Sequence, residues 1–217
     1  MRLMTKRPED ARLVFLGDAM DRGPDPLGVL SFLMQDERNV LLKGNHDAMA
    51  WCSSLPWGMT SSMWMRNGGW VTLDAFRETM DGGAPCGIDN GGVPKLFEEY
   101  WFRSRNWWRS GNVLFVHAGM PPWADAEWLE EDPERAVMHD DSFMWWRPER
   151  SADLYRKPRT VDGKPVFTVF GHTPIPEEHT MFNYGISLDK GYVLKMAAEM
   201  RPGGRVRFVT TQCDEVD

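Results

Sequence analysis

Side chains that can bind metal ions follow four short apolar runs of this 217-residue sequence. They are Asp18, Asn45, His117 and His172, and each lies within three residues of the end of its run. Carboxylate, amide and imidazole groups suit divalent ions such as Mn, Fe or Zn better than a thiolate site would. Two such ions, about 3.5–4 Å apart, can hold a phosphate group and activate a water molecule that attacks it. The four residues therefore predict a metal centre that hydrolyses phosphate esters.

The elements that must position these side chains are the apolar runs at residues 12–16, 39–42, 112–116 and 166–170. Each run is rich in β-branched or aromatic residues and does not alternate with polar ones, which is typical of strands buried on both faces of an α/β core. Ligands of open α/β sheets collect at the carboxyl ends of strands. We therefore expect an α/β fold in which the four polar side chains meet at strand ends.

Helices are expected between these strands, because apolar residues recur there at helical spacing. The predicted helices span residues 24–34, 70–80 and 94–108. In the third, Leu96, Tyr100 and Trp107 are expected on the inner face.

The last part of the sequence favours β-structure. Residues 186–189, 192–196 and 206–209 look like successive antiparallel strands joined by glycine turns, and residues 82–92 are a glycine-rich loop. No internal repeat occurs. The whole chain, residues 1–217, is predicted to be one domain with an aromatic-rich insertion at about 47–110.

Composition excludes several classes of protein. The apolar fraction of 42% and the charged fraction of 26% are those of a soluble globular protein. A net charge of −7 argues against binding to nucleic-acid duplexes, which requires many cationic side chains. No apolar run approaches the roughly 20 residues of a membrane span, and the N-terminus has no signal-peptide core. Three widely spaced cysteines fit thiols of a reducing compartment. We expect a cytoplasmic protein without a membrane partner.

The histidines point to a functional site. The sequence has five, and three of them, His46, His117 and His172, come directly after buried apolar runs. A single histidine in such a place is most simply a hydrogen-bonded core residue. Three together, beside Asp18 and Asn45, favour a site.

The motifs around these residues resemble a known family. Gly17-Asp-Ala-Met-Asp-Arg-Gly23 resembles the GDxxDRG signature of the calcineurin-like metallophosphoesterases, and Gly44-Asn-His-Asp47 resembles their GNH(E/D) motif. Val116-His-Ala-Gly119 and Gly171-His-Thr-Pro174 are similar to the HAG and GHTP motifs of the bacterial branch. That branch includes the lambda-phage phosphatase, bacterial serine/threonine phosphatases and symmetrical diadenosine-tetraphosphate hydrolases. The resemblance implies an α/β/β/α sandwich of two mixed sheets.

The resemblance also implies roles for individual residues. Asp18 corresponds to the aspartate that bridges two divalent ions, and Asn45, His117 and His172 to the other ligands of the second ion. Manganese is the expected metal, with iron, zinc or nickel as alternatives.

Four further positions would act on the substrate. His46 resembles the general acid that protonates the leaving oxygen, and Asp21 the carboxylate that orients its imidazole. Arg22 and Arg147 resemble two phosphate clamps, whose guanidinium groups hold phosphate oxygens in a fork. For Arg147, stacking on a surface tryptophan is an alternative interpretation.

One family motif does not occur in the sequence. Family members begin with a strand ending in Gly-Asp-x-His, which supplies two ligands to the first metal, and the family spacing would place it before Met1. In one account the sequence begins after that first strand. Residues 5–12, which resemble the end of the next helix, favour this account. In the other account the protein is naturally short and binds one metal or none.

Three functions remain as hypotheses. The first is a phosphomonoesterase that acts on protein Ser/Thr phosphate through metal-activated water. The second is a nucleotide hydrolase of the diadenosine-tetraphosphate type. The third is a catalytically silent phosphate-binding protein. The insertion is expected to overhang the site, and its aromatic residues either form core or stack on a base, with core favoured.

Overall fold

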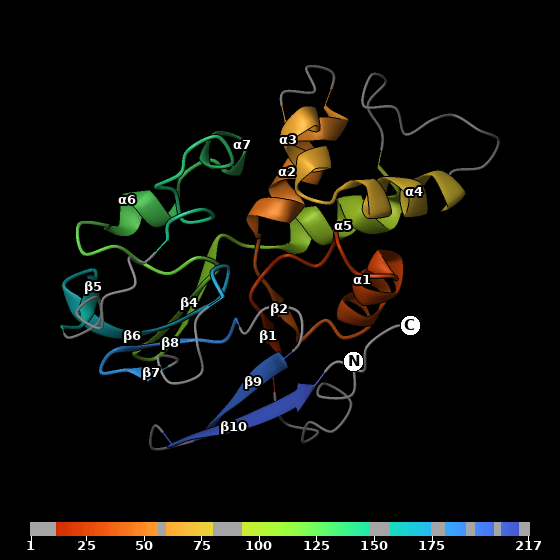
Figure 1. The fold of residues 1–217 in the computed structure, drawn as a ribbon. Coiled ribbons are helices and arrows are strands. Elements are labelled where there is room, and N and C mark those ends of the chain that lie inside the picture. The colour runs from red at the N-terminus through yellow and green to blue at the C-terminus, as the bar shows by residue number, and fades with distance from the viewer. Residues whose placement is uncertain are drawn as a thin grey trace.

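The computed structural model describes residues 12–55, 60–79, 93–147, 157–174, 181–189, 194–201 and 205–212 (Figure 1). The helices are α1 Pro26–Met34, α2 Asn45–Ser54, α3 Ser61–Arg66, α4 Trp70–Thr79, α5 Lys95–Arg103, α6 Ala126–Leu129 and α7 Pro133–Ala136. The strands are β1 Val14–Phe15, β2 Val40–Leu41, β3 Trp107–Ser110, β4 Val113–Val116, β5 Arg159–Val161, β6 Lys164–Phe170, β7 Met181–Phe182, β8 Gly185–Ser187, β9 Leu194–Arg201 and β10 Arg205–Gln212.

A mixed six-stranded sheet forms the largest β-element. Its order is β3-β4-β6-β8-β7, and β5 pairs with β6 outside this path. Strands β4, β6 and β8 are parallel, whereas β3 and β7 pair antiparallel to their neighbours. Strands β1 and β2 form a separate parallel pair, and β9 and β10 an antiparallel one. The predicted α/β class is confirmed.

Two hydrophobic clusters hold helices and strands together. Helix α1 packs against α4 and α5, and α2 packs against α3, so that most helices share one large core. A smaller cluster joins the strands: it contains Val40, Leu42, Phe115, Val169 and Ile186, with Val14 and Leu16 packed against it. Figure 1 shows α2 to α5 gathered beyond one end of β1 and β2. The smaller cluster therefore holds the β1–β2 pair beside the six-stranded sheet. The site requires this arrangement.

The four apolar runs are confirmed as strands β1, β2, β4 and β6. The helix predicted at residues 24–34 begins two residues later, at Pro26, because the Asp25 side chain caps it by accepting the Gly28 N–H at 2.7 Å. The helix predicted at residues 70–80 is α4, Trp70–Thr79.

The prediction for residues 94–108 is wrong at its C-terminal end. Helix α5 ends at Arg103, and the next residue, Ser104, has an extended backbone. Ser104 donates both its N–H and its hydroxyl to the Tyr100 carbonyl. Trp107 lies in β3, not on a helical inner face, and pairs with Val116 of β4. Cross-strand pairing with β4 outweighs the helical pattern of the apolar residues.

The pairing predicted near the end is wrong for its first strand. β8, which overlaps residues 186–189, is parallel to β6 and antiparallel to β7. The later strands β9 and β10 do pair antiparallel, as predicted. The predicted loop at residues 82–92 lies outside the described residues. Helices α2 and α3, which were not predicted from the sequence, lie in the predicted insertion.

Candidate metal centre

Parallel strand pairs bring the four candidate ligands together. β4 and β6 are parallel neighbours, so His117 and His172 emerge beside each other at their carboxyl ends. β1 and β2 are likewise parallel, with Val14 opposite Val40, and lead into the segments that carry Asp18 and Asn45. A hydrogen bond between the pairs links His117 Nδ1 to the Leu16 carbonyl at 2.7 Å. All four sequence-predicted ligands therefore share one site.

The oxygen and nitrogen atoms of the four candidate ligands converge. His117 Nδ1 faces the Leu16 carbonyl, and this contact directs His117 Nε2 toward the other candidate ligands. This Nε2 lies 3.1 Å from Asn45 Oδ1, 3.2 Å from His172 Nδ1 and 3.5 Å from Asp18 Oδ2. A carboxylate oxygen, an amide oxygen and two imidazole nitrogens thus lie within bonding reach of one position. The donor set therefore fits a divalent ion.

His172 adds a second sign of an ion site. Its Nε2 is buried and has no hydrogen-bond partner, which is rare for a polar atom of a protein interior. Burial and the neighbouring His117 lower the pKa of His172 to about 3, so the ring is neutral and one of its two nitrogens, Nδ1 beside His117 or the unpartnered Nε2, keeps a lone pair for a metal. Within the described part of the chain, Asp18, His117 and His172 are the one group of three such residues whose ligand atoms lie within 4.8 Å of one another.

The backbone around the centre is strained. Among the described non-glycine residues, five have positive φ, and four of them belong to the predicted site: Asp18, Asp21, Arg22 and His172. Left-handed backbone costs free energy and persists where the surroundings impose it. Gly17, with φ 96°, permits the close approach of two chain segments, because a Cβ there would lie 2.6 Å from the Gly44 nitrogen. The strain is concentrated where ligands must be directed inward.

Asp47 holds this strained loop and was not predicted as a site residue. It is completely buried at the start of α2 and accepts backbone N–H groups from Asp18, Ala19 and Gly44 at 2.9 to 3.0 Å. The Tyr100 hydroxyl donates to the same carboxylate at 3.2 Å. Burial and the nearby Asp18 raise the pKa of Asp47 to about 7, which the backbone donors oppose. The GNHD spacing places Asp47 beside Gly44, but its other partners come from distant segments.

Asp18 itself receives a hydrogen bond from α2. The His46 backbone N–H, in the first turn of that helix, donates to Asp18 Oδ1 at 3.0 Å. Burial acts to raise the pKa of Asp18, but His117, His46 and this hydrogen bond lower it, so the carboxylate is ionised. A helix N-terminus also favours nearby negative charge. The position thus suits an anionic metal ligand.

His46 and Asp21 form a buried pair, as the sequence predicted. His46 Nδ1 lies 2.5 Å from Asp21 Oδ2, and both side chains are nearly inaccessible to solvent. Burial lowers the pKa of His46, but the charges of Asp18 and Asp21 outweigh it and raise the pKa overall. The pair therefore favours a protonated imidazole, the form that can act as an acid.

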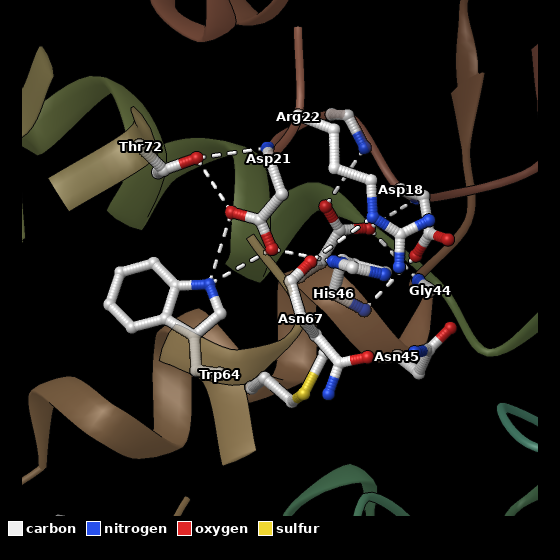
Figure 2. A network of polar contacts seen from close by, with 12 residues as sticks. Asp18, Asp21, Arg22, Gly44, Asn45, His46, Trp64, Asn67 and Thr72 are labelled. Atoms are coloured by element: carbon white, nitrogen blue, oxygen red, sulfur yellow. Dashed lines mark hydrogen bonds and ion pairs between the residues drawn. The ribbon is translucent and has the colours of Figure 1, made fainter. Parts of the chain in front are cut away.

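Asp21 has further partners that were not predicted from the sequence. Trp64 of α3 donates its indole N–H to both carboxylate oxygens at 3.0 Å, and Thr72 of α4 donates its hydroxyl to Oδ1 at 2.7 Å (Figure 2). Both side chains are buried. No short motif marks them, because they lie 43 and 51 residues from Asp21.

The two arginines lie at the edge of the site and are exposed. Arg22 donates from Nε to the Asn67 carbonyl at 3.1 Å, in the turn between α3 and α4 (Figure 2). Arg147 donates to the Thr173 hydroxyl at 3.2 Å, and its charge contributes to the low pKa of His172. The structure therefore brings Arg147 next to a candidate ligand.

The aromatic residues of the predicted insertion are mostly packed. Trp64 and Trp101 are buried, and Trp51 stacks on Trp101 with ring centroids 5.3 Å apart. Trp70 and Phe102 are exceptions, with 61% and 69% of their surfaces exposed. This packing supports the core interpretation for the described rings. In the described residues, no helix is both long and apolar enough to cross a membrane.

Comparisons with known proteins agree with this geometry. A 66-residue stretch is 39% identical to "Serine/threonine-protein phosphatase 1" of Salmonella typhimurium (strain LT2). The match covers 30% of this chain and 29% of that relative, so the chain matches less than a third of the relative's length. The family model described as "Calcineurin-like phosphoesterase" matches residues 2–194. With nearly the whole length matched and the family's motifs gathered at one site, the chain belongs to the calcineurin-like phosphoesterase family.

Proposed function

We propose that the chain is a metal-dependent phosphomonoesterase that acts on phosphoserine and phosphothreonine in proteins. One observation carries the proposal: oxygen and nitrogen atoms of Asp18, Asn45, His117 and His172 converge beside the His46–Asp21 pair. Metal ligands and an imidazole that can donate a proton together suit phosphate-ester hydrolysis. The similarity to a protein named a serine/threonine-protein phosphatase supports a phosphoprotein as substrate.

The four converging residues would hold the metal. Asn45 and Asp18 offer hard oxygen atoms, and His117 and His172 offer imidazole nitrogens, a mixture suited to manganese, iron, zinc or nickel. Divalent ions, when bound, supply positive charge for phosphate oxygens and lower the pKa of the attacking water. The hydrogen bond from His117 Nδ1 to the Leu16 carbonyl orients the ring so that Nε2 faces the centre.

The remaining residues would act on the phosphate ester. His46, held through Nδ1 by Asp21, donates a proton from Nε2 to the leaving oxygen. Arg22 and Arg147 bind the nonbridging phosphate oxygens, because planar guanidinium groups donate two parallel hydrogen bonds to such oxygens. The N-terminus of α2, which begins at Asn45, adds a favourable potential for the anionic substrate.

Turnover assays with Mn²⁺ test the proposal. The protein is expected to hydrolyse p-nitrophenyl phosphate and a phosphoserine peptide, and EDTA is expected to abolish both reactions until Mn²⁺ is restored. Turnover of diadenosine tetraphosphate in preference to the phosphopeptide would contradict the proposed substrate and favour a nucleotide hydrolase. Turnover of none of the three, with or without Mn²⁺, would contradict the proposed activity.

A further inference from the structure

Asp21, the partner of His46, is surrounded by donors from two helices of the predicted insertion. Trp64 of α3 contacts both carboxylate oxygens through its indole N–H, and Thr72 of α4 contacts Oδ1 through its hydroxyl (Figure 2). His46 Nδ1 contacts Oδ2 from the other side at 2.5 Å. Because three side chains contact its two oxygens, the Asp21 carboxylate is held in one orientation.

Thr72 also fixes the backbone of Asp21. The Asp21 N–H donates to the Thr72 hydroxyl oxygen at 2.9 Å, while the same hydroxyl donates to Asp21 Oδ1. Asp21 has a φ of 66°, a conformation that an aspartate adopts only at a cost. The paired hydrogen bonds compensate for that cost and hold both main chain and side chain of Asp21.

The Trp64 side chain is also closely packed. Its indole lies against Gly69 in the turn between α3 and α4, where a Cβ would come within 2.5 Å of the ring atom Cδ1. Trp64, Thr72, Asp21 and His46 are all buried, so water is poorly placed to replace a missing donor. Removing one donor therefore frees the carboxylate to rotate away from His46.

We propose that Trp64 and Thr72 are positioning residues for proton donation: they fix the Asp21 carboxylate so that His46 presents Nε2 to the leaving oxygen. The inference rests on the proposed function, because it concerns the protonation step of that reaction. It assigns to α3 and α4 a part in catalysis, in addition to their part in the core.

The leaving group of the substrate separates this role from a purely structural one. Phenyl phosphate has a poor leaving group that needs a proton, whereas 2,4-dinitrophenyl phosphate has one that leaves without it. With Mn²⁺ present, Trp64→Phe and Thr72→Val are each expected to lower kcat for phenyl phosphate about tenfold, the scale of a lost supporting hydrogen bond. For 2,4-dinitrophenyl phosphate we expect kcat within about twofold of wild type, because that step does not depend on His46. KM should stay unchanged for both substrates.

Matched variants control for packing. Thr72→Ser keeps the hydroxyl and is expected to restore the phenyl phosphate rate, while Trp70→Phe makes the same change as Trp64→Phe at an exposed position of α4. Melting temperatures of all variants establish that they fold. Equal losses for the two phosphates, or no loss for either, would overturn the inference.

A second measurement does not require turnover. In long-range proton–nitrogen NMR spectra, His46 of the wild-type protein should carry its proton on Nδ1 toward Asp21, and Trp64→Phe and Thr72→Val should weaken or shift that signal. Absence of turnover by the wild type would defeat the proposed function, yet the NMR comparison would still decide the positioning role. An unchanged His46 signal in both variants would overturn it.

Discussion

Replacing His46 with asparagine is expected to lower kcat for phenyl phosphate by roughly 10²–10⁴, the usual contribution of general acid–base catalysis. Asparagine keeps a polar side chain next to Asp21 but has no proton that it can transfer at neutral pH. The charges of Asp18 and Asp21 raise the pKa of His46, so the wild-type ring is held in the form that donates. The effect should fall on kcat and leave KM nearly unchanged, because the proton moves only in the reaction.

A matched histidine provides the control for this experiment. His139 is exposed and lies away from the predicted ligands in the sequence, so His139→Asn should keep the wild-type rate. The His46→Asn loss should also be much smaller with 2,4-dinitrophenyl phosphate than with phenyl phosphate. An unchanged phenyl phosphate rate in His46→Asn would remove His46 from its proposed role.

Replacing Asp47 with alanine is expected to reduce the free energy of unfolding by about 3–5 kcal/mol, as when one partner of a buried charged network is removed. The change leaves the N–H groups of Asp18, Ala19 and Gly44 without their acceptor in a fully buried place. It also removes a carboxyl group whose ionised form raises the pKa of Lys43, which burial lowers to about 8. Urea unfolding of the variant and the wild type measures the difference.

The same unfolding experiment on Asp140→Ala gives the baseline, because Asp140 is exposed. We expect that variant to stay within about 0.5 kcal/mol of wild type, the usual range for surface substitutions. A loss for Asp47→Ala no larger than the Asp140→Ala change would show that the loop around Asp18 does not depend on this carboxylate.

The sequence was sufficient to predict the ends of the site-forming strands and the polar residues next to those ends. Buried apolar runs form strands because of the residue types within the run itself. A residue that follows a parallel strand must lie at the carboxyl edge of the sheet, so the proximity of His117 and His172 could be expected. The His46–Asp21 pair could be expected from the family motifs, and the structure shows the contact. These features depend on short stretches of sequence.

Features that depend on distant contacts could not be predicted in this way. Trp64 and Thr72 look like ordinary core residues of amphipathic helices, and only the folding of α3 and α4 over Asp21 gives them a polar partner. The end of α5 was misplaced because pairing between β3 and β4 decides the conformation of Trp107. The pairing of β8 with β6 was missed for the same reason.

Metal binding measured by calorimetry tests the central claim most directly. We expect Mn²⁺ to bind the wild-type protein, and His117→Ala to weaken that binding about 100-fold or more, because His117 Nε2 lies at the centre of the converging ligand atoms. His139→Ala, which removes an exposed imidazole, should bind Mn²⁺ as the wild type does. Equal affinity of wild type and His117→Ala for Mn²⁺ would contradict the assignment of these residues as a metal centre.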